Sequence, residues 1–276
     1  MCNLLAAFHC DAPLEAFKYL KTIIDKTLLE NEDELESLYH HKRLINAFGF
    51  VVGNVELDEQ KEILHKEVLL LHCKKTEKAV QFGVEILGIA LWRARNCIFN
   101  LRAEEVQLIL QVSINQLQLF IEYYKNELKD LVWRNLYILN KDDEKSREVW
   151  SKRRLFLRTV ELILALFRVR ETEDEILLRM VAPTPDNKEI NTLKSLIPDL
   201  KEFCKGDKKC YEEVKNRAND GKMKYKSYLP LKSRIQFKIE DKDRDASIPD
   251  YMYALEKFTN GDDCNIKILR VDDDQE

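Results

Sequence analysis

The chain has 276 residues, of which 45% are hydrophobic and 34% are charged, and its formal net charge is −4. A chain of this length can bury roughly 70–75% of its unfolded surface, so it needs no disulfide or metal ion to hold a core. The small negative charge excludes a global positive field that would attract nucleic acid or anionic lipid.

Residues that end helices are scarce over most of the sequence. No proline occurs between Leu14 and Ala182, and no glycine occurs between Ile89 and Lys205. Proline and glycine are the strongest local breakers of regular structure. Their absence therefore predicts a series of helices joined by short polar segments.

Caps and apolar stripes divide this region into helices. Asp11 and Pro13 begin the first predicted helix, because aspartate caps exposed amides and proline fits the first turn. Further polar starts predict helix pairs near residues 12, 57, 101 and 144. Their spacing of about 43–45 residues lies within the ~40–47 typical of HEAT and armadillo repeats. We expect a mainly α domain over 1–182, built of antiparallel helix pairs as a HEAT/armadillo-like solenoid or an irregular helical bundle.

Two of these helices are predicted to be central. Polar residues are few in 80–92, and in 155–169 they form one narrow strip of Arg158, Glu161 and Arg168. Helices that are apolar over most of their circumference are usually buried on several sides. We therefore expect both segments in the core.

The composition changes at Pro183 and Pro185, in a turn-rich joint. A helical extension is predicted over 183–221. It contains one helix from about Glu189 to Cys204 and another from about Lys209 to Asn219. Because proline disrupts a helix interior, Pro198 is expected to kink or split the first of them.

A small α+β tail is predicted over 222–276. Ile235, Phe237 and Ile239 alternate with polar residues, as in a half-buried strand. Residues 265–271 form a second predicted strand, and 250–258 form a short helix between the two. Two strands alone are marginal, so the tail must dock on the helices or add to the sheet of a partner.

The most unusual predicted surface is a row of polar side chains in the third helix pair. Their spacing of 4, 4, 3 and 4 residues places them on one stripe of a helix. Neutral amides can donate and accept hydrogen bonds along an extended peptide, and armadillo-type scaffolds use asparagine rows in this way. An ordinary polar face or an interhelical contact would look the same. The stripe consists of Gln107, Gln111, Asn115, Gln118 and Glu122.

Two basic segments offer alternative surfaces. Residues 152–158 include Arg153, Arg154 and Arg158 and suit an acidic partner, unless the segment is the charged entry turn of a core helix. Residues 222–234 interleave lysines with tyrosines, a pattern that can hold phosphates and stack on bases. These segments carry the alternative of a nucleic-acid-associated helical protein.

Motifs for enzyme chemistry are missing from the sequence. No phosphate-binding glycine loop, G-x-S-x-G or H-E-x-x-H motif occurs, which disfavours an enzyme, although a catalytic site assembled from scattered residues stays open. The seven cysteines contain no C-x-x-C pair, so no metal site or cofactor is predicted.

The ends of the chain bear on its location and context. The opening residues lack a basic leader, and no segment is apolar over enough length to span a bilayer. We therefore expect reduced thiols and a cytoplasmic or nuclear location. Apolar residues 4–8 are typical of the end of a buried helix, which favours a chain that is part of a larger protein. The predicted function is a protein–protein interaction scaffold or adaptor.

Overall fold

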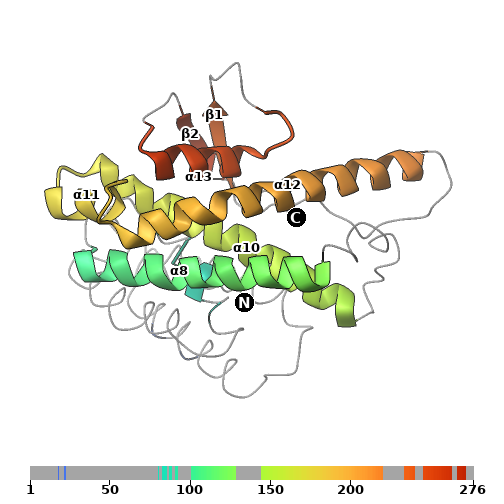
Figure 1. The fold of residues 1–276 in the computed structure, drawn as a ribbon, viewed down its shortest axis with the longest axis horizontal. Helices are drawn as coiled ribbons and strands as arrows, with labels where there is room; N and C mark the ends of the chain where they lie inside the picture. Colours follow the sequence, from blue (N-terminus) through green and yellow to red (C-terminus); the bar gives the residue numbers. More distant parts are fainter. Residues whose placement is uncertain are drawn as a thin grey trace. The chain divides into compact units, whose positions relative to one another are not determined.

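A computed structural model describes residues 18, 22, 80, 83–85, 87–88, 91–92, 101–128, 144–219, 233–239, 245–262 and 266–271 (Figure 1). The chain divides into two compact units. The first comprises Met1–Val112 with Ala165–Met180, and the second comprises Ser113–Leu164 with Val181–Glu276. Apart from Lys18 and Thr22, which are helical, the helices predicted within 12–73 lie outside the described residues, as does nearly all of the basic segment 222–234.

The described part of the chain is mostly helical, as predicted. Helix α8 spans Ala103–Tyr123, and a π-helical turn, η3, continues it over Tyr124–Leu128. The carboxylate of Glu105 accepts a hydrogen bond of 2.8 Å from the backbone N–H of Arg102. A glutamate three residues after the cap satisfies one of the amides left unpaired at a helix start, so the sequence specifies this beginning locally.

The first unit contains one of the two segments expected to be central. The described members of 80–92 are helical and buried, with Val84, Leu87 and Leu91 fully enclosed. Arg168 lies in the short 3-10 helix η5 (Arg168–Glu171) and donates hydrogen bonds to the backbone carbonyls of Leu91 and Trp92, at 3.0 and 3.1 Å. Burial is therefore confirmed for these residues.

Helix α10 (Glu144–Phe167) confirms the second expectation, because every residue from 155 to 167 is buried. In the second unit an aromatic cluster joins it to other elements. The ring of Phe156 stacks on Phe120 of α8 with centroids 4.7 Å apart and meets Phe203 edge-on at 5.0 Å. Large buried rings supply much of the apolar area that stabilises such a core.

A short helix that the sequence analysis did not anticipate precedes the proline joint. Helix α11 spans Glu175–Val181. The carboxylate of Asp174 caps it by accepting hydrogen bonds from the backbone N–H groups of Ile176 and Leu177, at 2.9 and 3.2 Å. Aspartate at this position is a standard N-cap, so the signal was present in the sequence.

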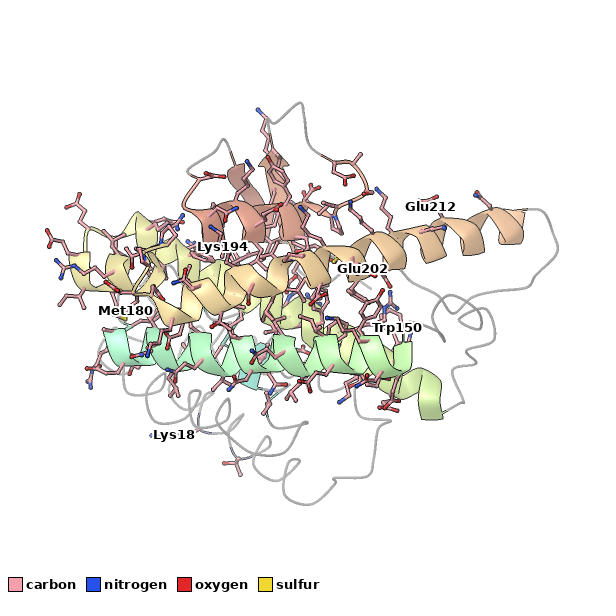
Figure 2. All side chains as sticks on the ribbon, viewed as in Figure 1. Lys18, Trp150, Met180, Lys194, Glu202 and Glu212 are labelled. Atoms are coloured by element: carbon pink, nitrogen blue, oxygen red, sulfur yellow. The ribbon has the colours of Figure 1, made fainter. Side chains whose placement is uncertain are left out.

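Helix α12 corrects the prediction of two separate helices in the extension. It runs without a break from Lys188 to Asn219, through Pro198, and Figure 2 shows it continuing past Glu202 to Glu212. Pro198 is exposed. A stripe of buried apolar residues runs along α12 on both sides of Pro198 in the sequence. It keeps the helix packed, although proline removes one backbone hydrogen bond. The stripe consists of Ile190, Leu193, Ile197, Leu200 and Phe203.

The α+β tail has the predicted elements. Strand β1 (Ile235–Ile239) pairs antiparallel with β2 (Ile266–Val271), with a bulge between Gln236 and Phe237. Helix α13 (Asp250–Asn260) contacts both β1 and α12, so it lies between the sheet and the long helix (Figure 1). The tail therefore docks on the helices of its own chain, which is one of the two arrangements expected.

Candidate functional site

Buried and exposed side chains lie on opposite sides of helix α8. Val106, Ile109, Leu110 and Leu117 are almost fully buried. The predicted stripe occupies the opposite side: Gln107, Gln111, Asn115 and Glu122 are exposed, and Gln118 is half-buried. The structure thus places all five predicted residues on one helix and along its outer side.

Two leucines that the sequence analysis assigned no role lie on the same side. Leu119 is 57% exposed and Leu108 is 37% exposed. Eleven residues correspond to about three helical turns, so the two side chains point within about 20° of one another. Glu104 is also exposed. It lies five whole turns from Glu122, about 27 Å along the helix.

We call this surface the α8 face, and it combines apolar, amide and acidic groups. Helix α8 contains no lysine or arginine. Downstream of it, the ammonium of Lys125 is directed to Asp199, at 2.8 Å. The positions lie on one continuous helix, so helical geometry alone sets their spacing. The α8 face consists of Glu104, Leu108, Gln111, Asn115, Leu119 and Glu122, with Gln107 and Gln118 along its border.

The arginines of the segment 152–158 point into the protein. Arg153 is 2% exposed, and its guanidinium Nη2 lies 2.7 Å from Oδ1 of Asp207 on α12. Arg158 is also buried, and Arg154 is half-buried. The segment therefore behaves as the charged part of a core helix, and it presents no continuous basic surface.

Arg158 belongs to a buried network centred on Glu161. Arg158 donates from Nη1 to both carboxylate oxygens, at 3.0 and 2.8 Å. Arg234, next to β1, donates its backbone N–H at 2.7 Å and its guanidinium at 3.0 and 2.9 Å. The hydroxyl of Ser233 adds a fourth partner group, at 3.1 Å. The network joins α10 to the residues directly before β1.

The surroundings of Glu161 keep it ionised. Full burial raises the pKa of the carboxyl by desolvation, but the charges of Arg158 and Arg234 and their hydrogen bonds outweigh this, so the pKa falls to about 2. Its two oxygens are occupied by donors from within the chain. Glu161 is therefore suited to holding the tail in place, and it is unsuited to proton transfer near neutral pH.

The buried thiol of Cys204 offers no nucleophile either. Its sulfur lies 3.7 Å from the hydroxyl oxygen of Tyr251, and burial raises the pKa of the thiol far above its ordinary value. A thiol is reactive as the thiolate, which burial disfavours here. Within the described residues, no group of three or more His, Cys, Asp or Glu side chains converges on a possible metal position.

Comparisons with protein-family models, with curated proteins and with solved structures find no match for this chain. Among the helices that the structure describes, none is long and apolar enough to cross a membrane.

Proposed function

We propose that the chain is a protein–protein interaction scaffold or adaptor that presents the α8 face to a partner. The observation that carries the proposal is the contrast along α8, where amides and leucines are exposed together. Leu119 is the clearest member, at 57% exposed. Contiguous apolar surface rimmed by polar groups marks interaction sites, and we propose that Leu108 and Leu119 together supply the apolar part of such a surface.

The arrangement of the helices belongs to the same proposal. Pairs of helices at a spacing of about 44 residues, stacked in a HEAT- or armadillo-like row or packed as an irregular bundle, would present α8 as part of a larger surface. Such a scaffold would act in the cytosol or nucleus, where its thiols stay reduced.

The nucleic-acid alternative receives less support from the same residues. Phosphate binding needs several exposed cations in a stripe. Arg153 and Arg158 are buried beside Asp207 and Glu161, and Arg234 is buried as well. These three side chains are therefore used for internal ion pairs, which leaves the interaction scaffold as the preferred function.

A charge-insertion experiment tests the proposal. Gln107, Gln111 and Asn115 are changed together to Glu in the full chain, and proteins recovered with this bait are quantified against those recovered with the unchanged bait. Removing three added carboxylates from water in an interface costs free energy, so partner recovery should fall by about tenfold or more.

The control places the same three charges elsewhere. Thr184, Ser195 and Asn260 are exposed neutral residues outside α8, and their change to Glu should leave recovery unaffected. Equal recovery with the α8 variant and with the unchanged chain would contradict the proposal. A loss with both variants would show only a general effect of charge, and it would also count against the α8 face.

A further inference from the structure

We propose that the partner of the α8 face is an amphipathic helix with two apolar side chains eleven residues apart and a lysine or arginine near each end. This inference rests on the proposed function and specifies the chemistry of its partner. Three properties of the face carry it: the spacing of the leucines, the position of the carboxylates, and the absence of cations within α8.

The spacing of the leucines selects a helix over an extended segment. Leu108 and Leu119 lie about 16 Å apart along the axis and point in nearly the same direction. An extended chain covers that distance in about five residues, and side chains five residues apart point to opposite faces of a strand. A second helix packed alongside α8 covers it in eleven residues, which again returns to the same face. One helix can therefore contact both leucines.

The ends of the α8 face select the charge of the partner. Exposed carboxylates stand beyond each leucine, Glu104 before Leu108 and Glu122 after Leu119. Helix α8 itself carries no lysine or arginine. Charged groups at the rim of an interface choose between partners, because opposite charges attract and like charges repel. Lysine or arginine near each end of the partner helix would meet these two carboxylates.

The amides between the leucines fit such a helix. Gln111 and Asn115 are exposed between the two apolar positions. A side-chain amide can both donate and accept, so it tolerates serine, glutamine or a charged side chain opposite it. These positions therefore contribute hydrogen bonds, while the leucines fix the register and the carboxylates fix the charge.

A second copy of the chain is a poorer occupant for a specific reason. A two-fold axis beside the middle of α8 would place Leu108 of one copy against Leu119 of the other, which is favourable. The same axis would place Glu104 of one copy against Glu122 of the other at both ends. Two pairs of like charges in contact disfavour that dimer. The leucines alone would permit self-association, and the carboxylates argue against it.

Binding of a designed probe tests the inference. The probe is a fluorescent alanine-based peptide, held helical by a hydrocarbon staple on its outer side, with leucines eleven residues apart and a lysine four residues beyond each. We expect it to bind the full chain in an anisotropy titration. A probe with glutamates in place of the lysines, and one with leucines nine residues apart and hence on opposite faces, should each bind about tenfold more weakly or worse.

Variants of the protein supply the reciprocal evidence. Exchange of Glu104 and Glu122 together for Gln should weaken binding of the lysine probe about tenfold. The affinity of the glutamate probe should stay the same or rise slightly. Far-UV circular dichroism of this variant should match that of the unchanged chain, because both residues are exposed. Leu119→Asp should abolish binding of all probes.

Each outcome decides the inference. Equal binding of the lysine and glutamate probes, no binding of either, or no effect of the Glu104 and Glu122 exchange would overturn it. A wild-type dimer in sedimentation that Leu119→Asp dissociates would overturn it in favour of a second copy. The exchange of Gln107, Gln111 and Asn115 for Glu distinguishes failure of this inference from failure of the proposed function. If that variant loses its partner while the charge of the probe has no effect, the scaffold function stands, and a partner helix with lysine or arginine at its ends is rejected.

Discussion

Helices α8 and α10 use their polar residues in opposite ways. Helix α10 is rich in charge, yet Arg153, Arg158 and Glu161 are all buried and pair within the chain. Helix α8 carries mostly neutral amides on its polar side, and these are exposed. The helix with the higher charge thus contributes to the core, and the helix with the lower charge presents the candidate surface.

The difference follows from the cost of removing a charge from water. A buried ion must be paired and hydrogen-bonded, so a chain that buries arginine must also supply a carboxylate nearby. Asp207 and Glu161 fill that role here. Amides need no such compensation at the surface, where water or a partner can satisfy them.

The largest expected effect comes from breaking the network around Glu161. Replacement by Gln leaves the guanidiniums of Arg158 and Arg234 buried without a compensating charge. Removing one member of a buried ion pair typically lowers the free energy of unfolding by about 3–5 kcal/mol, which urea denaturation would measure. The control is Glu175→Gln, because this side chain is 85% exposed beside Arg179 and should change stability very little.

The pH dependence of the free energy of unfolding gives an independent test of the role of the Glu161 charge. The pKa of Glu161 is lowered from 4.5 to about 2 in the folded chain, so its stabilising contribution is complete above about pH 4.5. That contribution, about 3 kcal/mol, is lost as the pH falls from 4.5 through 2. The unchanged chain and the Gln variant should therefore converge in stability on acidification. Parallel curves across this range would show that the carboxylate charge is not what holds the network.

A matched pair on α8 tests whether its two sides differ as described. Leu117 is fully buried and Leu119 is 57% exposed, although both lie on the same helix. Leu117→Ala should lower the free energy of unfolding by about 3 kcal/mol, from lost burial and the cavity left behind. Leu119→Ala should change it by less than about 0.5 kcal/mol, because alanine also favours the helix. Similar losses for both would mean that Leu119 is needed for folding, which would remove it from a partner surface.

Local patterns predicted much of the described fold. Alternation at Ile235, Phe237 and Ile239 correctly indicated strand β1, and the predicted helix 250–258 covers all but the last two residues of α13. These elements depend on side chains close together in the sequence. The continuity of α12 through Pro198 depends instead on tertiary burial of one stripe, which overrides the local preference of proline.

The candidate site divides in the same way. The polar stripe of α8 could be found from its spacing alone, because helical periodicity is local. The exposure of Leu119 could not, since leucine in an amphipathic helix is normally a core residue. The pairing of Arg234 with Glu161 joins residues 73 positions apart, and no pattern in the sequence identifies it. Arg153 looked available because its acidic partner, Asp207, lies on another element, whereas Arg158 pairs with Glu161 three residues further along the same helix.

The ion pair with Asp207 holds Arg153 in the interior, and its contribution to stability can be measured. Its partner Asp207 is 10% exposed, whereas Asp199, which pairs with Lys125, is 34% exposed beside a half-exposed lysine. Asp207→Asn should lower the free energy of unfolding by about 2 kcal/mol, because it leaves a buried guanidinium without its counter-charge. The same change at Asp199 should cost less than about 0.5 kcal/mol.

The same substitution is made at both aspartates, so the two ion pairs differ in their burial and in their cation, Arg153 or Lys125. A small loss at both positions would show that Arg153 reaches solvent easily, and the segment 152–158 would again become available to an acidic partner. A large loss at Asp207 alone would keep that arginine in the core. The α8 face would then be the better-supported surface for recognition.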